Sequence, residues 1–495
     1  PDYPFLPEYE KWYGAIQKHY ESYHTSDGST FQKGNVFRVE YNKLLTDGNS
    51  RRYQKFDNYK RGKPQEITLP KRYTIGEISI ERQIDDNGWV KQTKDLESNI
   101  TNYGYDNIGR IKYIDAPDEW ADTFFNWSEY SSTNRPKVIT TRCELNSSKT
   151  DCEAGKSKFR TTTIYDVLLR PISVQATDLT TNSSVYQVSR FNAFNNLLFE
   201  SFSSFESFLY PYSAELEGTS YTYDGLQRLR TESVNGEGEK TSYYMGDNKI
   251  RVIDARGNET TTAYLAYGYR NYEQVTRIES PENITTDIEV NIFGNITSIK
   301  QSGKNHSTDI SLTEYRAYDS QKRLCQIKRD DVGTTVFKRN TIGEVEWQAE
   351  GQTSTSNTVC NSSANDIDKV NFIYDNLGDK RTISYGDSTP TTTFSYDDNG
   401  NIRNITNSFF SQSYTYNSLN LLEDETLTIA GRSGSLVLDY DYDVLGNLAY
   451  IKYPDTTEKV SFLPNGFGQA TQVIRNYKGS TPDDIFIKAD ITYYP

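Results

Sequence analysis

The sequence predicts an all-β fold in which strand–turn–strand units follow one another along the chain, preceded by a short N-terminal helix. Three observations predict it. A seven-residue motif recurs from residue 105 onward, apolar and polar residues alternate on either side of it, and the 495-residue chain combines many aromatic residues (13%, with 39 Tyr) with a mean hydropathy of −0.76. Repetition of one motif indicates an array of like units stacked on one another. Such an array gains buried surface unit by unit, so its length need not create separate cores.

Residues 1–24 differ from the rest of the chain. After Pro7, apolar side chains recur at helical spacing, at Tyr9, Trp12, Tyr13, Ile16, Tyr20 and Tyr23. This spacing predicts one amphipathic helix over residues 8–23, weakened by Gly14, that packs on the first unit of the array.

Residues 25–100 are predicted to form strands that lead into the array. They contain turn signals at Asp47-Gly48 and Asp86-Asn87-Gly88 but no complete copy of the motif. Two short basic clusters, Arg51-Arg52 and Lys60-Arg61-Gly62-Lys63, are predicted to be solvated strand edges. Charged edges of this kind oppose aggregation between sheets.

Residues 101–495 form the repeat array, and we call its recurring motif the frame. A frame consists of an aromatic residue, Asp, two variable residues, Gly or a substitute, Arg or Asn, and an aliphatic residue. Eight copies occur, at Tyr105–Ile111, Tyr165–Pro171, Tyr223–Leu229, Tyr318–Leu324, Tyr374–Lys380, Tyr396–Ile402, Tyr416–Leu422 and Tyr442–Leu448. Two weaker copies keep the spacing but lose the Tyr-Asp pair: Phe191–Leu197 and Val290–Ile296.

Each frame is predicted to join two strands through a tight turn. Residues before a frame alternate, as in Thr391–Tyr396, and so do residues after it, as in Ile296–Lys300. Alternation of this kind is typical of strands with one buried face. The Asp side chain can bond the backbone two residues on, and Gly or Asn at the fifth position accommodates a positive φ.

Two stretches interrupt the alternating pattern. Residues 203–219 are predicted to form a short helical or irregular excursion. The polar stretch Gln352–Asp366, which is rich in Ser, Thr and Asn, is predicted to be an insertion loop between units.

The frames closely resemble those of the Rhs/YD-repeat proteins. This family includes polymorphic toxins of bacteria, the C components of insecticidal toxin complexes and the ectodomains of teneurins. The resemblance covers roughly residues 60–480 and rests on the eight frames. It implies a long β-sheet wound spirally into a hollow shell, which in the bacterial members encloses a C-terminal toxin domain.

Bacterial members of that family often end the shell with a self-cleaving aspartyl site of the Asp-Pro-x-Gly type. Asp118, Asp455 and Asp483 lie near prolines, but none begins such a segment. The resemblance therefore carries autoproteolysis onto no residue of this sequence. The sequence begins at Pro1, not Met, and ends at Tyr493–Pro495 straight after an alternating strand pattern, so we expect it to be a piece of a longer protein. The cleavage element and the toxin domain are then absent from this piece or lie beyond residue 495.

The bulk composition narrows the range of partners. The net charge is −14, from 54 basic and 68 acidic residues, which argues against a nucleic-acid partner because phosphate binding needs a basic surface. No apolar run approaches the length that spans a membrane. Apolar residues make up only 35% of the chain, and Tyr offers both a ring to bury and a hydroxyl for water. This composition suits a sheet that is wetted on both faces.

Four cysteines are present, at positions 143, 152, 325 and 360. Neither Cys143 and Cys152 nor Cys325 and Cys360 has the Cys-x-x-Cys spacing of a zinc site. Cys143 and Cys152 bracket a polar turn and form either a hairpin disulfide or an inert pair of thiols. Cys325 and Cys360 flank a region of one to two repeats, so these two residues can also come into contact. A disulfide would imply an exported protein.

Groups able to support catalysis are few. His19 and His24 lie five residues apart, which does not place two ligands on one helix face, and the remaining histidine is His306. Asp439, Asp441 and Asp443 lie on one strand face, but Val444 and Tyr450 occupy the places where an EF-hand needs Gly and Glu. We interpret the three carboxylates as a solvated acidic face. The sequence predicts no catalytic residue, no cofactor and no metal site.

We therefore expect the chain to be a non-enzymatic wall of a shell that encloses a polypeptide cargo, such as a toxin domain. The whole protein is expected to be secreted or to lie at the cell surface. Other subunits of a secretion or toxin complex are expected as further partners. An adhesin or ligand-binding module is the alternative. An outward aromatic cluster at Trp120, Phe124, Phe125 and Trp127 would favour the adhesin, whereas inward aromatics would favour the shell. A hydrolase is the third and least supported hypothesis.

Overall fold

The structure is a computed structural model. It describes residues 9–12, 16–24, 30–44, 51–129, 135–205, 216–268, 271–306, 308–354, 356–361, 363–454, 459–476 and 485–493.

Within these residues the fold is one antiparallel sheet of 38 strands, in which each strand pairs with the next along the chain. The strands up to the first long insertion are β1 (Tyr9–Trp12), β2 (Ile16–His24), β3 (Thr30–Leu44), β4 (Arg51–Asp57), β5 (Glu66–Pro70), β6 (Glu77–Ile84), β7 (Val90–Lys94), β8 (Ile100–Tyr105), β9 (Ile111–Asp115), β10 (Asp122–Ser128), β11 (Lys137–Cys143), β12 (Phe159–Tyr165), β13 (Pro171–Asp178), β14 (Ser183–Phe191) and β15 (Leu197–Ser201).

The central strands are β16 (Gly218–Tyr223), β17 (Leu229–Val234), β18 (Gly238–Met245), β19 (Lys249–Ile253), β20 (Glu259–Tyr264), β21 (Val275–Ser280), β22 (Ile284–Val290), β23 (Ile296–Asn305), β24 (Thr308–Tyr318), β25 (Leu324–Arg329), β26 (Gly333–Arg339) and β27 (Val345–Gln352). The last strands are β28 (Lys369–Tyr374), β29 (Lys380–Tyr385), β30 (Thr392–Tyr396), β31 (Ile402–Thr406), β32 (Phe410–Tyr416), β33 (Leu422–Ile429), β34 (Leu436–Tyr442), β35 (Leu448–Lys452), β36 (Lys459–Ser461), β37 (Gln472–Asn476) and β38 (Ile485–Asp490). Two short 3₁₀ turns, η1 (Pro281–Asn283) and η2 (Asp366–Asp368), connect strands.

The predicted helix over residues 8–23 is wrong. The described part of this segment forms β1 and β2, and β2 pairs with β3 in the same sheet. Aromatic and β-branched residues are poor helix formers and favour strands. Pairing of β2 with β3 also satisfies the backbone hydrogen-bonding groups on the edge of β3, which a helix over these residues would leave unpaired. The sheet then continues without a break, and β8 spans the position at which we separated residues 25–100 from the array.

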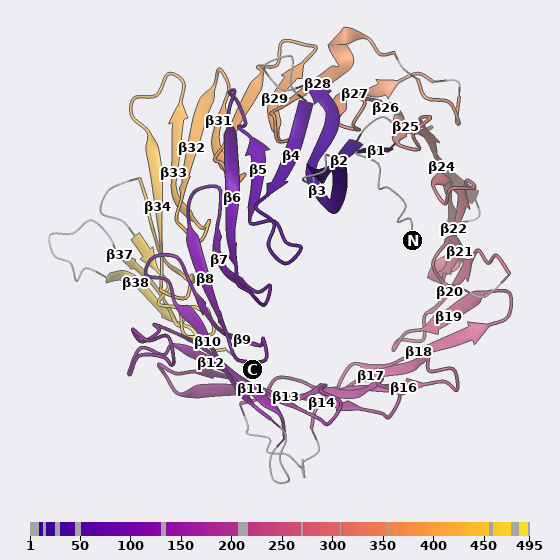
Figure 1. Ribbon diagram of the computed structural model, residues 1–495. Helices are drawn as coiled ribbons and strands as arrows, with labels where there is room; N and C mark the ends of the chain where they lie inside the picture. The colour runs from indigo at the N-terminus through magenta and orange to yellow at the C-terminus, as the bar shows by residue number, and fades with distance from the viewer. Residues whose placement is uncertain are drawn as a thin grey trace.

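The sheet curves into a ring around an open centre and then overlaps itself (Figure 1). Strands β4–β9, drawn in indigo and purple, lie beside β29–β34, drawn in orange and yellow. Hydrogen bonds that join the two layers connect residues 288 to 323 positions apart in the sequence. One circuit of the spiral therefore takes about 300 residues. We call residues 9–343 the first circuit and residues 344–493 the second circuit.

The antiparallel order divides the turns between the two edges of the ribbon. All the frames predicted from the sequence follow even-numbered strands, such as β8, β12, β28 and β34. Because consecutive strands run in opposite directions, these frames all lie on one edge, which we call the frame edge. The turns that follow odd-numbered strands lie on the opposite edge.

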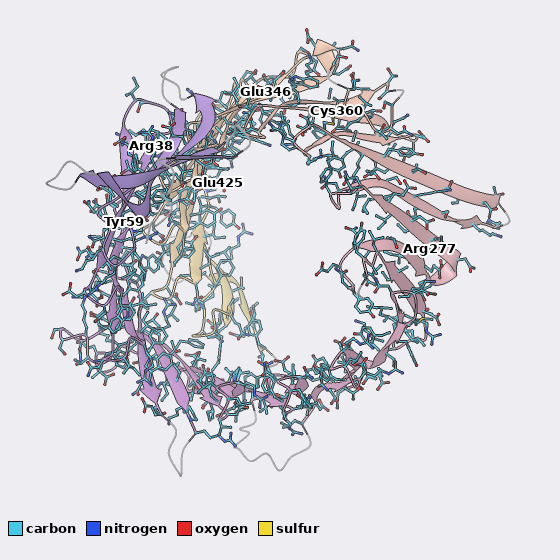
Figure 2. The ribbon with its side chains drawn as sticks, turned by 45° about the vertical axis from the view of Figure 1, so that its right-hand side comes forward. Arg38, Tyr59, Arg277, Glu346, Cys360 and Glu425 are labelled. Atoms are coloured by element: carbon cyan, nitrogen blue, oxygen red, sulfur yellow. A yellow bond between two sulfur atoms is a disulfide. The ribbon has the colours of Figure 1, made fainter. Side chains whose placement is uncertain are left out.

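The wall is a single sheet with little deeply buried apolar surface. One described cluster consists of Phe124, Cys143 and Leu145, with Tyr113 and Cys152 packed against it. Elsewhere cationic side chains cover aromatic rings, as where the guanidinium groups of Arg228 and Arg230 lie 4.0 and 3.9 Å from the ring centres of Tyr244 and Tyr243. Figure 2 shows described side chains on both faces of the ribbon around the open centre.

The two predicted interruptions have different outcomes. The insertion Gln352–Asp366 is confirmed as a loop between β27 and β28, which ends in η2. Within the other predicted interruption, residues 206–215 lie outside the described part of the chain, and the described residues on either side belong to no helix.

Candidate functional site

The second residue of the frame organises its turn. In the frame Tyr223–Leu229, one carboxylate oxygen of Asp224 accepts the N–H groups of Leu226 and Arg228 at 2.9 and 3.0 Å. The other oxygen accepts the Arg228 guanidinium at 2.8 Å. This side-chain hydrogen bond is the chief reason why the pKa of Asp224 lies below its usual value. The predicted role of the Asp in bonding the backbone two residues on is confirmed.

The fifth residue of the frame adopts the left-handed conformation that the sequence predicted. Gly109, Gly378 and Gly446 have φ of 90°, 109° and 88°, and Asn195 and Asn420 have φ of 71° and 60°. Leu169, Gln227 and Lys322 adopt the same region at φ of 60°, 64° and 66° without being Gly or Asn. The Asp network therefore holds even residues for which this conformation is costly.

The first residue of the frame links one frame to the one before it. The Tyr416 hydroxyl donates to the carbonyl of Ile402 at 2.9 Å, and Tyr442 donates to the carbonyl of Leu422 at 2.7 Å. In each case the acceptor is the residue that ends the preceding frame. Tyr105, Tyr223, Tyr318, Tyr374 and Tyr396 donate in the same way, to Val90, Leu197, Ile296, Val345 and Lys380.

These contacts reveal frames that the Tyr-Asp pattern missed. Asp85, Asn340 and Asn465, which follow even-numbered strands, each accept two main-chain N–H groups as Asp224 does. Asp254 also accepts two, but it follows β19, so its turn lies on the opposite edge. The residues three positions after them, Gly88, Gly257, Gly343 and Gly468, all have positive φ. Asp or Asn followed three residues later by Gly therefore finds turns that the Tyr-Asp pattern missed, whereas Leu169, Gln227 and Lys322 show that a frame does not require Gly at this position.

The frame edge of the second circuit docks on the opposite edge of the first circuit, and we call this contact the seam. In five successive frames the third residue of the frame makes the contact, although sequence analysis treated this position as variable. Asn376 bonds Lys71 and Arg72, Asp398 bonds Glu97, Ser418 bonds Trp120, Val444 bonds Ala121 and Gly466 bonds Asp178. The seam closes the sheet on itself and is the candidate functional site.

A buried ion pair anchors one end of the seam. The Arg72 guanidinium donates to Asp375 at 2.9 Å and also to Asp379. The side chains of Arg72 and Asp375 are 5% and 0% exposed. The other oxygen of Asp375 accepts the N–H groups of Leu377, Gly378 and Asp379 at 2.8–2.9 Å, so the turn of the second circuit orders the carboxylate that receives Arg72.

Arg52 and Tyr73 extend this anchor. Arg52 pairs with Glu344 at 2.9 Å and donates to the Asp375 carbonyl at 3.1 Å. The Tyr73 hydroxyl accepts the N–H of Tyr396 at 2.7 Å. Burial lowers the pKa of Arg72, but the bonds and charges of Asp379 and Asp375 outweigh it and raise the pKa above its usual value. The prediction that Arg52 belongs to a solvated edge is wrong, because the second circuit covers this edge.

Alkaline pH is expected to weaken the seam. Burial, together with the charges of Asp379 and Asp375, raises the pKa of Tyr396 to about 12, against about 10 in an unfolded chain. A raised pKa gives stability that is fully present below pH ~10 and is lost as the pH rises toward 12. The free energy of unfolding, measured across this range, should fall as tyrosinate absorbance appears.

The variant Tyr396→Phe is the control for this pH dependence. It keeps the ring but removes the hydroxyl that donates to Lys380, at an expected cost of about 1 kcal/mol at neutral pH. Its alkaline loss of stability should be smaller than that of the wild type. An identical loss in both proteins would show that Tyr396 does not contribute to it.

A tight backbone contact closes the other end of the seam. A Cβ at Gly466 would lie 2.7 Å from an Asp178 oxygen and 3.1 Å from its Cα, and the neighbouring Phe467 ring lies 5.8 Å from the Phe159 ring of the first circuit. Gly466→Ala is expected to destabilise the protein by about 1–3 kcal/mol through overpacking, measured by urea unfolding.

Gly225 provides the matched control for Gly466. It is also the third residue of a frame, but a Cβ there meets nothing within 4 Å. Gly225→Ala should change stability by less than about 1 kcal/mol, with either sign. Equal effects of the two alanine variants would mean that the seam does not constrain Gly466.

The aromatic residues proposed for an adhesin do not form one outward cluster. Phe124 is 8% exposed and lies in the buried cluster. The Trp127 indole donates to Ile111 at 2.7 Å, and Trp120 donates to Ser418 at 3.0 Å across the seam. Trp120, Phe125 and Trp127 are all half-buried. Trp120 and Trp127 therefore make hydrogen bonds within the wall.

The three carboxylates after residue 438 do not act together. Asp439 faces Lys452 at 3.9 Å, Asp441 is exposed, and Asp443 is the second residue of a frame, which accepts Leu445 and Asn447. Among the described residues, no group of three or more His, Cys, Asp or Glu is placed to hold a metal ion. His19 and His24 lie on β2, where their side chains fall outside the description, and His306 is exposed in a turn.

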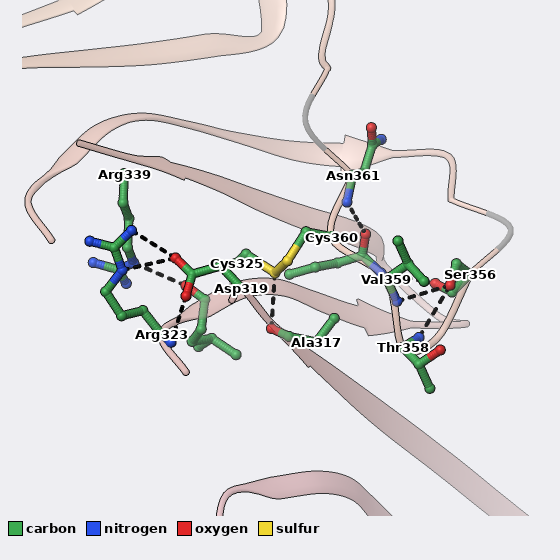
Figure 3. The surroundings of a disulfide bond; sticks show 12 residues. Ala317, Asp319, Arg323, Cys325, Arg339, Ser356, Thr358, Val359, Cys360 and Asn361 are labelled. Carbon is green, nitrogen blue, oxygen red and sulfur yellow. Dashed lines mark hydrogen bonds and ion pairs between the residues drawn. A yellow bond between two sulfur atoms is a disulfide. The ribbon is translucent and has the colours of Figure 1, made fainter. Parts of the chain in front are cut away.

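Both proposed cysteine pairs form disulfides. Cys143 and Cys152, with Cα atoms 5.8 Å apart, close a hairpin, and Cys325 and Cys360 (5.6 Å) fasten the loop between β27 and β28 to β25. Figure 3 shows the second disulfide, beside the frame residues Asp319 and Arg323. The fully buried Gln326 also holds this loop, since it donates to the Ser356 carbonyl at 2.9 Å and accepts the N–H of Asn361 at 3.2 Å.

The remaining basic cluster stays on the surface of the first circuit. Lys60 pairs with Asp86 at 2.8 Å, and Arg61 and Lys63 donate to the carbonyls of Asp86 and Gly88 at 2.7 Å. The cationic side chains of this cluster therefore bind acceptors in the neighbouring turn at residues 86–88. No helix in the described part of the chain is both long enough and apolar enough to cross a bilayer.

The strands and the seam together make a YD-shell-like fold, in which one spiral antiparallel sheet forms the wall. No family model and no curated protein matches the sequence. Solved structures do match, among them a Tc holotoxin pore and two structures of TcdB2-TccC3.

The crystal structure of TcdB2-TccC3-Cdc42 has a TM-score of 0.52 at 12% identity, over 96% of this chain and 27% of that one. The Photorhabdus luminescens Tc holotoxin pore with the TccC3-D651A mutation has a TM-score of 0.54 at 10% identity, over 96% and 26%. TcdB2-TccC3 without the hypervariable C-terminal region has a TM-score of 0.54 at 11% identity, over 96% and 27%. The chain thus spans about a quarter of each of these chains, and at this identity the likeness concerns the fold.

Proposed function

We propose that this chain is a wall segment of an Rhs/YD-repeat shell that encloses a polypeptide cargo, such as a toxin domain, within a larger secreted protein. The observation that carries the proposal is the seam. A sheet that merely displayed binding loops would not need to dock one circuit on another with buried ion pairs and main-chain bonds. A container needs this closure, because an open slit would admit proteases.

The chemistry of the wall suits this role. Tyrosine hydroxyls and paired charges leave both faces polar, so an enclosed polypeptide would meet no continuous apolar surface that could bind it irreversibly. Two disulfides fit an oxidising destination outside the cell, in keeping with secretion. The similar structures include a Tc holotoxin pore and a TcdB2-TccC3 without its hypervariable C-terminal region, which supports a toxin as cargo. On this proposal the wall segment carries no catalysis of its own.

Limited proteolysis of the protein as its own cells produce it would test the proposal. We expect polypeptide attached to the wall to resist protease in the wild type and to become cleavable in Arg72→Ala, which opens the seam. Arg277→Ala removes a half-exposed ion pair with Glu279 and Asp287 and should leave the resistance unchanged. Cleavage of the attached polypeptide at the same rate in all three proteins would contradict the shell. Turnover of a substrate by the purified wall would contradict the absence of catalysis.

A further inference from the structure

A pocket of about 450 Å³ opens in the first circuit, where β10, β11 and β12 lie beside the frame Tyr165–Pro171. Its lining is mainly apolar and consists chiefly of Trp127, Pro136, Val138, Tyr165 and Leu169. Trp127 and Val138 stand directly opposite each other on β10 and β11, so their side chains project from the same face of the sheet. The pocket therefore has the size and the lining of a site for a small apolar molecule.

The hydroxyl of Tyr165 gives this pocket one polar group. Seven of the eight Tyr residues that begin a frame donate to the carbonyl of the residue that ends the preceding frame. For Tyr165 that residue is Ile111, but the Trp127 indole takes this place and donates to the Ile111 carbonyl at 2.7 Å. The Tyr165 hydroxyl has no hydrogen-bond partner among the described residues, although Tyr165 is half-buried. A ligand that bonds this hydroxyl would satisfy it.

Leu169 lines the pocket at a conformational cost. Its φ is 60°, in the left-handed region that Gly adopts freely and Leu does not. Its side chain is 69% exposed, so burial within the wall offsets little of this cost. A molecule in the pocket would cover part of this side chain and gain from its burial.

The charged side chains at the pocket lie in water and are largely paired. The Arg110 guanidinium donates to Asp106 at 2.7 Å and to Glu129 at 3.3 Å. The Glu129 side chain is 73% exposed, and Lys137 is exposed. A charged group held against the apolar lining would lose its hydration without a counter-ion beside it. The pocket therefore favours an uncharged ligand, and its single free hydroxyl cannot satisfy the many hydroxyl groups of a sugar.

We propose that this pocket binds an uncharged, flat ring compound that carries one hydroxyl or carbonyl group. The ring packs against the Trp127 indole in an offset or edge-to-face arrangement, and Val138 and Leu169 bury its remaining surface. The polar group of the ligand forms a hydrogen bond with the Tyr165 hydroxyl. This site is separate from the seam and does not require the wall to enclose a cargo.

Equilibrium dialysis of the purified protein with naphthalene and 2-naphthol as probes would test this inference. The wild type should bind one molecule of 2-naphthol per chain, about fivefold more tightly than naphthalene, because one additional hydrogen bond contributes about this factor. Tyr165→Phe keeps the ring but lacks the hydroxyl, so this variant should bind the two probes equally. 2-Naphthoate, which places a carboxylate on the same ring, should bind more weakly than naphthalene.

Tyr223→Phe is the matched control for Tyr165→Phe. Tyr223 also begins a frame, but its hydroxyl donates to the Leu197 carbonyl at 2.8 Å. Tyr223→Phe should therefore lower the midpoint of urea unfolding and keep the preference for 2-naphthol. Tyr165→Phe should leave the midpoint unchanged and abolish the preference.

Leu169→Gly removes one side of the pocket without straining the turn, because Gly adopts a positive φ freely. The affinity for both probes should fall by about fivefold, while the midpoint of urea unfolding should not fall. Gln227→Gly is the control, since Gln227 holds the same place in its frame at a φ of 64° and should leave both affinities unchanged.

Three outcomes would overturn the inference. Absence of saturable binding of either probe to the wild type would show that the pocket is not a ligand site. Affinities that are the same in the wild type, Tyr165→Phe and Leu169→Gly would show that the probes bind elsewhere. Tighter binding of 2-naphthoate than of naphthalene would contradict an uncharged ligand.

Discussion

Arg72→Ala is expected to destabilise the closed sheet by about 3–5 kcal/mol, because it leaves the Asp375 carboxylate buried without its cation. The Asp375 side chain is 0% exposed, so water cannot replace the guanidinium without opening the seam. Amide hydrogen exchange across residues 375–379 and 396–399 should be at least about a hundredfold faster than in the wild type. Urea unfolding should show a matching loss of stability.

Three further variants separate charge burial from other effects of losing Arg72. Arg277→Ala removes an ion pair in which Arg277 is 46% exposed, and should cost less than about 1 kcal/mol. Arg72→Met combined with Asp375→Asn keeps an acceptor for the three N–H groups of the turn and removes both charges. This double variant should be more stable than Arg72→Met alone. If it is not, the cost of losing Arg72 comes from packing and not from the uncompensated carboxylate.

Much of the local structure could be predicted from the sequence, because a frame encodes it within seven residues. The Asp side chain and the left-handed fifth residue determine the turn, and alternation determines the strands on either side. The N-terminal segment shows the limit of this reasoning. Its apolar spacing fits a helix as well as a strand, and the hydrogen bonds that decide between them come from β3.

The seam could not be predicted from the sequence alone. Its partners lie about 300 residues apart, and no local pattern contains that offset. Arg72 sits in an ordinary loop, and Asp375 looks like every other frame Asp until the second circuit arrives. The third and fourth residues of the frame look variable for the same reason. Contacts with the other circuit, and not the conformation of the turn itself, determine which residues suit these two positions.

Cys360→Ser is expected to lower the stability by about 4 kcal/mol. The Cys325–Cys360 bridge joins residues 35 positions apart, and in the chain-entropy model the unfolded state regains the freedom of that loop. Cys360 is half-buried, so serine adds no strongly buried polar group, whereas Cys325 is 4% exposed. Urea unfolding with and without a reductant should show the loss, and reductant should have less effect on the variant than on the wild type.

Cys152→Ser is the matched control, since Cys152 is also half-buried. Its bridge to Cys143 spans only 9 positions, so the same model gives a smaller loss of about 2.5 kcal/mol. The two variants should also differ in where they loosen the wall. Hydrogen exchange should rise around Gln326 and residues 356–361 in Cys360→Ser, because Gln326 bonds that loop, and around residues 143–152 in Cys152→Ser. The reverse order of stabilities would mean that native packing around each bridge, and not loop closure in the unfolded chain, sets its contribution.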